Sequence, residues 1–311
     1  MPEAARISCV AVFPIYGFMN SKPNISTACD IISVTGESPV WSSRDNALYW
    51  VDVRSNCIYR MNASDNIARW DMGERISSVG FRRDGGLIGT MISGIYAIDI
   101  SACGNVATKT MIVAPELPHG TRPKEGKADA NGCWWFGSTC DGNEPLGGYY
   151  RLRPDGSYVH VSDGVTMANG VAVNAKGDIV MAADSISKTI WAWSIDVKNN
   201  TLSERRVFSR GEGVNGLIDG ATFDEDGYYW CALFGEWSIA RFSPDGSLDR
   251  TIRLPVKYPT MCAFGGADLR TLYVTSSKFH ADNDLDLQPL AGSLFKIEGV
   301  NTRGVEEREF G

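Results

Sequence analysis

Three polar residues in this chain each stand directly before a short apolar segment, and their side-chain oxygens are of a kind that binds metal ions. These residues are Glu37, Asn169 and Asp219. Considered singly, Glu37 is a surface acid, and Asn169 and Asp219, each followed by glycine, are turn residues. A carboxylate that enters a buried strand needs a partner, however, because an unpaired buried charge is costly. Together, two carboxylates and one amide oxygen form a ligand set for one divalent cation: Ca2+, Mg2+ or Mn2+, or Zn2+ with oxygen ligands.

A fourth polar segment, residues 121–129, carries charges of both signs. It contains Arg122, Lys124 and Glu125. Taken alone, this segment is a solvated loop. It nevertheless stands at the same position relative to its neighbouring strands as the three oxygen-bearing residues, so its cations could reach a shared site.

The elements that would bring these residues together are revealed by a repeat in the turns. A polar turn, an aromatic or aliphatic strand, a second turn and another strand recur six times, at intervals of about 40 to 50 residues, as is typical of propeller blades. The copies are residues 44–61, 83–98, 131–152, 176–193, 226–242 and 269–297.

Short apolar segments between the copies supply a further, inner strand for each blade. The sequence therefore predicts an all-β fold, a six-bladed β-propeller in a single domain over residues 28–311, with a pair of β-sandwiches as the alternative. Residues 1–27 fit no repeat and are expected to form an N-terminal tail or an extra strand. Because inner strands line the central channel of a propeller, residues that precede them meet on one face.

Composition supports an all-β chain and argues against some functions. The 311 residues are 43% hydrophobic and 22% charged, with 33 Gly, 9 Trp and 11 Tyr, which fits many turns around a large aromatic core. A net charge of −7 argues against general nucleic-acid binding, which requires a basic surface. An anionic small substrate stays possible, since a site can be locally basic.

The cysteines and histidines do not suggest a zinc site of their own. Eight Cys form no CxxC pair and only three His are present. The spread of the cysteines fits a reduced compartment, although their even number leaves disulfides possible. The N-terminus is a poor signal peptide, and no apolar run is long enough to span a bilayer. We therefore expect a cytoplasmic protein with no membrane or nucleic-acid partner, as a monomer or small homo-oligomer.

Eight stretches, taken in order, resemble the SMP-30/gluconolactonase/luciferin-regenerating enzyme (regucalcin-like) family of six-bladed propeller lactonases. They are Gly-Glu-Ser-Pro-Val-Trp at 36–41, Leu-Tyr-Trp-Val-Asp at 48–52, Gly-Lys-Ala-Asp at 126–129, Ala-Asn-Gly-Val-Ala at 168–172, Asp-Gly at 219–220, Cys-Ala-Phe-Gly-Gly-Ala-Asp-Leu at 262–269 with Leu-Tyr-Val-Thr-Ser at 272–276, and Gly-Ser-Leu-Phe-Lys-Ile at 292–297. The resemblance extends from roughly residue 35 to residue 300.

The resemblance implies metal-dependent hydrolysis of a sugar lactone, an aldonolactone or an aldarolactone, to the open-chain sugar acid. By it, Glu37, Asn169 and Asp219 occupy the family's metal-ligand positions. Asp219 also matches the proposed general base, and Arg122 matches an arginine that contacts substrate. A cation in such a site would polarise the ring carbonyl and lower the pKa of nearby water, whose proton Asp219 could take.

The chain departs from the family's usual Arg-x-Asn-Asp-Gly-Lys pattern at two positions. Lys124 replaces a substrate-facing Asn, and Glu125 replaces an Asp. We hypothesise that Arg122 and Lys124 together recognise an anionic sugar lactone through charge-assisted hydrogen bonds. In the alternative, Lys124 points into solvent or pairs with Glu125.

Two other functions stay open on the same scaffold. One is an esterase or organophosphate hydrolase, because the same cation chemistry serves phosphoryl centres and a fold does not determine a substrate. The other is a non-catalytic propeller that binds Ca2+ or a partner protein. Metal analysis and a lactone assay would distinguish them.

Overall fold

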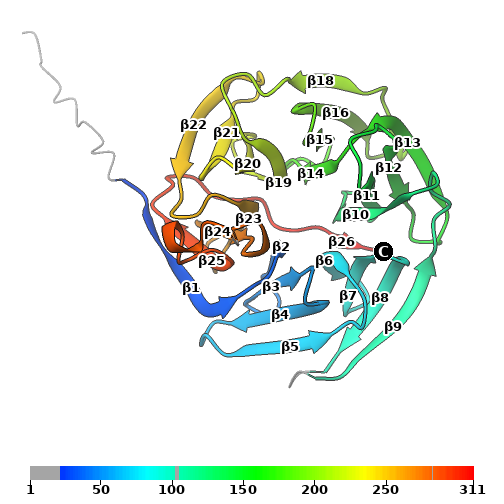
Figure 1. Cartoon of the computed structure of the whole chain (residues 1–311). Coiled ribbons are helices and arrows are strands. Elements are labelled where there is room, and N and C mark those ends of the chain that lie inside the picture. Colours follow the sequence, from blue (N-terminus) through cyan, green and yellow to red (C-terminus); the bar gives the residue numbers. More distant parts are fainter. Residues whose placement is uncertain (1–21, 102–104, 282) are drawn as a thin grey trace, which may run out of the picture.

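The computed structural model describes residues 22–101, 105–281 and 283–311, which form six sheets arranged around a central axis (Figure 1). In each sheet the main strands pair in chain order from the axis outwards. The exceptions are the outermost strand where the ring closes, a C-terminal strand added at one inner edge, and one extra outer strand. The predicted all-β, six-bladed propeller is therefore confirmed. We number the sheets as blades 1 to 6 in chain order.

The strands of the six blades are bounded as follows. Blade 1 contains β2 (Gly36–Ser42), β3 (Ala47–Asp52), β4 (Cys57–Asn62) and β5 (Ile67–Asp71), and blade 2 contains β6 (Ile76–Arg82), β7 (Leu87–Met91), β8 (Gly94–Ile100) and β9 (Ala107–Val113). Blade 3 contains β10 (Thr121–Ala128), β11 (Trp134–Cys140), β12 (Gly147–Leu152) and β13 (Tyr158–Val165). Blade 4 contains β14 (Ala168–Val173), β15 (Ile179–Asp184), β16 (Thr189–Asp196), β17 (Thr201–Leu202) and β18 (Arg206–Ser209). Blade 5 contains β19 (Leu217–Phe223), β20 (Tyr229–Phe234), β21 (Ser238–Phe242) and β22 (Leu248–Arg253). Blade 6 contains β23 (Pro259–Gly265), β24 (Thr271–Ser276), β25 (Ser293–Glu298) and β1 (Asn24–Ile32).

The six predicted repeats coincide with the second and third strands of the blades. The inner strands begin earlier than the sequence suggested, however. Glu37 lies inside β2, Asn169 inside β14 and Asp219 inside β19, rather than before these strands. The charged segment at 121–129, which alone resembles a solvated loop, is almost entirely the inner strand β10.

The ring closes in blade 6, where strands from the two ends of the chain pair. β1 is the outermost strand and runs antiparallel to β25. The first part of the predicted tail, residues 1–21, lies outside the described residues, and the single-domain organisation over 28–311 stays a prediction. Only two short 3-10 helices, η1 (Phe279–Ala281) and η2 (Leu285–Leu287), occur in the described part of the chain, so none of its helices could cross a membrane.

Aromatic side chains fill the wedges between neighbouring blades. Trp135 of blade 3 meets Trp193 of blade 4 at 5.5 Å between ring centroids, and Trp230 of blade 5 meets Phe264 of blade 6 at 5.8 Å. Such rings bury large areas and prefer tilted or edge-on contacts. The interfaces hold the inner strands in fixed relative positions, which a shared site on the axis requires.

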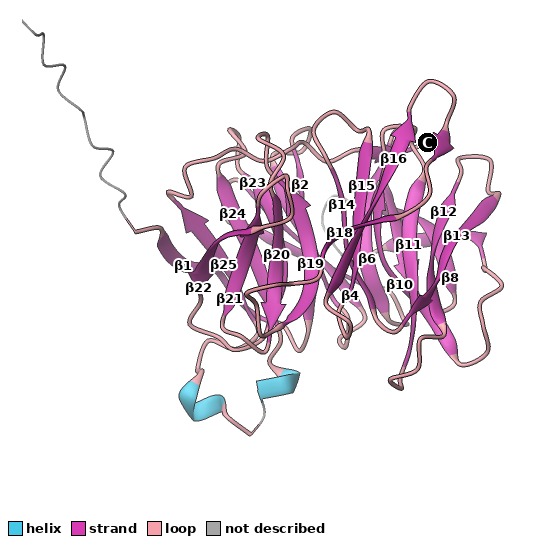
Figure 2. Cartoon of the chain, turned by 90° about the horizontal axis from the view of Figure 1, so that it is seen from above, coloured by secondary structure: helices cyan, strands magenta, loops and turns pink. Residues whose placement is uncertain are grey.

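The C-terminal segment crosses the end of the channel opposite η1 and η2 (Figures 1 and 2). Its last strand, β26 (Glu309–Phe310), adds to the inner edge of blade 2. Lys127 of β10 forms an ion pair with Glu307 at 2.8 Å, and these side chains are only 9% and 12% exposed. The channel is thus covered at this end, and it is open to a pocket at the other end.

Candidate functional site

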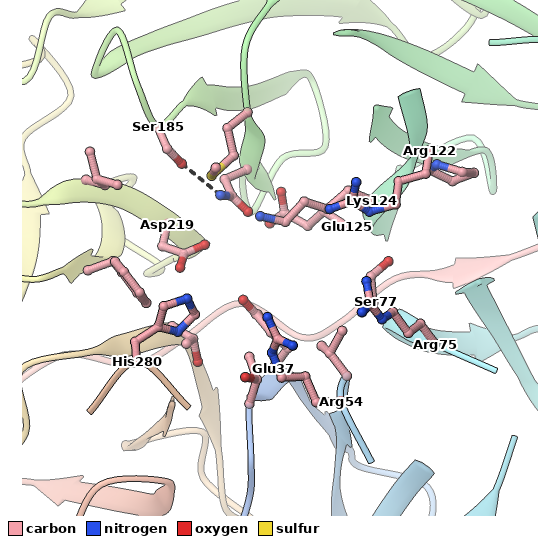
Figure 3. Close-up of a pocket in the computed structure, with 18 of the residues that line it drawn as sticks. Glu37, Arg54, Arg75, Ser77, Arg122, Lys124, Glu125, Ser185, Asp219 and His280 are labelled. Carbon is pink, nitrogen blue, oxygen red and sulfur yellow. Dashed lines mark hydrogen bonds between the residues drawn. The ribbon is translucent and has the colours of Figure 1, made fainter. Parts of the chain in front are cut away.

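A single pocket on the axis collects side chains from all six blades. Its volume is about 260 Å³, close to the lower end of the range for small-molecule sites. It is lined by inner strands and by the turns and loops beside them (Figure 3). All five residues singled out from the sequence line it: Glu37, Arg122, Lys124, Asn169 and Asp219.

A β-bulge near the start of every inner strand explains why these side chains converge. In each blade the register between the first two strands shifts at this point. The shifts lie between Glu37 and Val40, Ile76 and Ser78, Lys124 and Lys127, Asn169 and Ala172, Ile218 and Ala221, and Pro259 and Met261. A bulge bends its strand and redirects the local side chains. One polar ring therefore forms at one level of the channel.

The two carboxylates of this ring lie in an environment that disfavours their charge. Asp219 is only 7% exposed, and its Oδ1 is buried without a hydrogen-bond partner. Burial raises the pKa of Asp219 to about 6, against the opposing effect of Lys124. Burial also raises the pKa of Glu37 well above its ordinary value, and the negative charge of Asp219 raises it further. Both carboxylates would be stabilised by a nearby cation.

The side-chain amide of Asn169 is held in one orientation by Ser185. The Ser185 hydroxyl donates its hydrogen to the carbonyl oxygen of Ile218 at 2.5 Å, and this oxygen can only accept. Ser185 must therefore accept from Asn169, whose Nδ2 lies 2.7 Å from its Oγ. The amide nitrogen is occupied, and Oδ1 is left free to bind a ligand from the pocket.

These residues fit a divalent cation. An orphaned carboxylate oxygen, a second, partly buried carboxylate and a correctly oriented amide oxygen meet the preference of hard cations for oxygen ligands. Among the residues that the structure describes, no three His, Cys, Asp or Glu side chains form a metal-binding group. The fit depends on Asn169 as the third ligand.

Arg122 and Lys124 differ in how their charges are satisfied. Arg122 forms an ion pair with Asp141 at 2.7 Å, with Arg122 30% and Asp141 87% exposed. Lys124 forms no ion pair with any carboxylate of the described residues, Glu125 included, although its charge lowers the pKa of Glu37, Glu125 and Asp219. The ammonium of Lys124 thus acts on the site electrostatically without a direct carboxylate partner.

Glu125, which the sequence analysis did not assign to the site, is buried beside it. One of its carboxylate oxygens accepts the backbone N–H of Val171 at 3.1 Å, and the other has no hydrogen-bond partner. Burial raises its pKa to about 7. Its backbone has a positive φ of 55° at the bulge of β10, a conformation uncommon for a residue other than glycine.

Several other residues of the pocket were missed. Ser77 and Thr260 lie within the bulges of blades 2 and 6, as Asp219 does within the bulge of blade 5. An alignment of the inner strands could have found them. Arg54 comes from a turn, Arg75 from the connection before β6 and His280 from the short helix η1, and none of these segments carries a periodic signal.

Comparison with known proteins places the chain in a family. The model of the SMP-30/Gluconolactonase/LRE-like region matches residues 35–278. A 6-deoxy-6-sulfogluconolactonase of Pseudomonas putida is 35% identical over 285 residues, which cover 89% of this chain and 95% of the relative.

Solved structures share the fold. A luciferin-regenerating enzyme superimposes with a TM-score of 0.85 at 23% identity, covering 93% of this chain and 99% of the other. A regucalcin of Agrobacterium tumefaciens, described as a calcium-binding protein, has a TM-score of 0.84 at 20% identity, covering 94% and 97%. At these identities the likeness supports the architecture alone.

Proposed function

The chain belongs to the SMP-30/gluconolactonase/LRE-like family, and we propose on this premise that it is a metal-dependent lactonase that hydrolyses a sugar lactone to the open-chain sugar acid. The observation that carries the proposal is the unpartnered Oδ1 of Asp219 beside Glu37 and Asn169 in one axial pocket. A buried carboxylate oxygen without a partner is costly unless a ligand completes its environment.

In this proposal Glu37, Asn169 and Asp219 hold one divalent ion, either Ca2+, Mg2+, Mn2+ or Zn2+. Once bound, the ion supplies Lewis-acid polarisation of the lactone carbonyl. Ser185 contributes by keeping the amide oxygen of Asn169 directed at the ligand.

Asp219 is the proposed general base. Water attacks the carbonyl carbon, one carboxylate oxygen of Asp219 takes the proton, and the bond between that carbon and the ring oxygen breaks. The protonated carboxyl can then return the proton to the departing oxygen. The positive charges of Lys124 and of the bound cation would both favour the ionised form of Asp219, which can accept a proton.

Arg122 and Lys124 are the proposed substrate-binding residues. Both are donors without acceptor function, suited to the hydroxyl and acidic oxygens of a sugar derivative. The relative from Pseudomonas putida is named for a lactone that carries a sulfonate, which supports including anionic lactones among the substrates. The proposed substrates are aldonolactones and aldarolactones.

The test is a pH-drop assay on neutral and acidic sugar lactones, with the protein first freed of metal and then resupplied with each cation. The proposal requires turnover that depends on the cation and is lost in Asp219→Ala while the fold, followed by circular dichroism, is retained. Hydrolysis of aryl esters or phosphotriesters in place of lactones would favour the esterase or organophosphate hydrolase. Cation binding without any turnover would favour a non-catalytic propeller.

A further inference from the structure

The mouth of the pocket carries a concentration of positive charge that contrasts with the net charge of −7 of the whole chain. Four cationic residues line the pocket: Arg54, Arg75, Arg122 and Lys124. They come from three consecutive blades: Arg54 from the β3–β4 turn, Arg75 from the residue before β6, and the others from β10. We call these four residues the basic arc.

Two members of the basic arc, Arg75 and Arg122, lie apart from the proposed reacting end. Figure 3 shows Arg75 and Arg122 on one side of the cavity and Asp219 on the other, with Lys124 and Glu37 between them. A ligand whose carbonyl lies near Asp219 would therefore extend its remote end towards Arg75 and Arg122.

The charges of the arc are poorly satisfied within the protein. Arg75 and Lys124 form no ion pair with any carboxylate of the described residues. Arg54 stacks over the ring of Phe279, with 3.4 Å between its Cζ and the ring centroid, and it too has no carboxylate partner there. Arg122 pairs with Asp141, but that carboxylate is 87% exposed, and such ion pairs contribute little and exchange readily.

We propose that the basic arc is a subsite for an anionic substituent carried by the lactone at the end remote from its carbonyl. A carboxylate, a phosphate or a sulfonate shares the required chemistry, since guanidinium groups bind planar or tetrahedral oxyanions through paired, charge-assisted hydrogen bonds. Arg54 and Arg75 are thereby assigned a role in specificity. This inference rests on the proposed lactonase function.

The subsite can be tested by comparing substrates that differ only at the remote end. Hydrolysis of a neutral six-carbon aldonolactone is compared with that of lactones bearing a carboxylate, a phosphate or a sulfonate at the remote carbon. The preference for an anionic lactone is the ratio of its kcat/KM to that of the neutral lactone. Arg75→Gln should lower this ratio by about ten-fold, mostly through a higher KM for the anionic lactone. Rising ionic strength should lower kcat/KM for the anionic lactones and not for the neutral one.

Arg270→Gln is the matched control. Arg270 is an exposed arginine in the turn between β23 and β24, at the opposite end of the propeller, so this variant makes the same charge change away from the pocket. It should leave the ratio unchanged. An equal loss on all lactones in Arg75→Gln, or a wild-type enzyme with no preference for any anionic lactone, would overturn the subsite. A preference for only one of the three anions would identify the natural substituent.

A binding measurement separates failure of the subsite from failure of the lactonase. Calorimetric titration compares 6-phosphogluconate with gluconate on the wild type, Arg75→Gln and Arg270→Gln. Tighter binding of 6-phosphogluconate that disappears only in Arg75→Gln supports the subsite even if no lactone is hydrolysed. Equal binding of both acids by the wild type, with lactone turnover intact, would remove the subsite and leave the proposed function standing.

Discussion

The amide of Asn169 and the hydroxyl of Ser185 form a hydrogen bond whose direction is determined by a third group. Nδ2 of Asn169 lies 2.7 Å from Oγ of Ser185, and Oγ in turn gives its only hydrogen to the carbonyl oxygen of Ile218. These hydrogen bonds join blades 4 and 5, because Asn169 lies in β14 and Ile218 in β19. Ile218 directly precedes Asp219 in the chain. Two of the three proposed metal ligands are thus positioned by one hydroxyl.

Ser185→Ala should weaken cation binding without removing a ligand. The amide of Asn169 would lose the partner that orients it, and loss of such an outer partner typically costs about 10- to 100-fold in metal affinity. Calorimetric titration with Mn2+ or Ca2+ measures the change. Ser77→Ala is the control, because Ser77 also lines the pocket but its hydroxyl bonds the carbonyl of Thr90. Unchanged affinity in Ser185→Ala would show that the hydroxyl of Ser185 does not position Asn169.

Lys124→Asn should strengthen cation binding several-fold. The ammonium of Lys124 acts on Glu37 and Asp219 through its charge, and the same charge repels a divalent ion held by these carboxylates. The neutral amide removes the repulsion while retaining a polar side chain. The titration used for Ser185→Ala measures this effect at low ionic strength. Weaker binding in Lys124→Asn would mean that the lysine supports the site rather than opposing the ion.

The metal-free protein should lose stability as the pH rises from about 4 to about 7. Burial raises the pKa of Asp219 to about 6 and that of Glu125 to about 7. A carboxyl with a raised pKa stabilises the fold below its unfolded value, and this contribution is lost as the pH rises through the folded value. Thermal unfolding in a chelator measures the trend.

Asp219→Asn provides the comparison for this trend, since its amide does not titrate. The free energy of unfolding of the variant should decline less over the same pH interval, and the difference between the two proteins isolates Asp219. Adding a divalent ion at about 100 times its Kd should stabilise the wild type by about 2.7 kcal/mol. The same ion should stabilise Asp219→Asn much less. If the free energy of unfolding of the wild type in chelator rose with pH relative to that of the variant, the raised pKa of Asp219 would be contradicted.

Two buried ion pairs in equivalent positions of blades 3 and 5 should differ in strength. Arg151 contacts Asp129 at 2.6 Å, with both side chains at most 2% exposed. Arg241 contacts Asp224 at 2.6 Å and also Asp249 at 3.1 Å. Asp129→Ala leaves its arginine without a carboxylate partner, which should cost about 3–5 kcal/mol of unfolding free energy.

Asp224→Ala should cost less than Asp129→Ala, because Arg241 retains Asp249. Chemical unfolding of both variants measures the two losses. The dependence of the unfolding free energy on denaturant concentration should be the same in the variants as in the wild type. Equal losses would show that the exposed carboxylate of Asp249 does not stabilise the arginine.

The sequence predicted the blades because the turns and the aromatic strands repeat. It predicted the convergence of Glu37, Asn169 and Asp219 because each of them stands at the same place in its repeat. It placed these residues before their strands rather than within them, since a bulge leaves no periodic trace.

Other residues of the site could not be predicted from the sequence alone. The inner strand β10 faces a polar pocket and is therefore charged, so its sequence resembles a loop. Arg54 and Arg75 reach the pocket from a turn and a connection, whose paths depend on the packing of whole blades. Ser185 becomes relevant only when β14 and β19 lie side by side.

The central claim is that Glu37, Asn169 and Asp219 together hold one divalent cation. An anomalous difference map from crystals of the full chain grown with Mn2+ tests it most directly. The account predicts one strong peak in the axial pocket, within bonding distance of an oxygen from each of the three side chains. A peak elsewhere, or a pocket without one at saturating Mn2+, would contradict it.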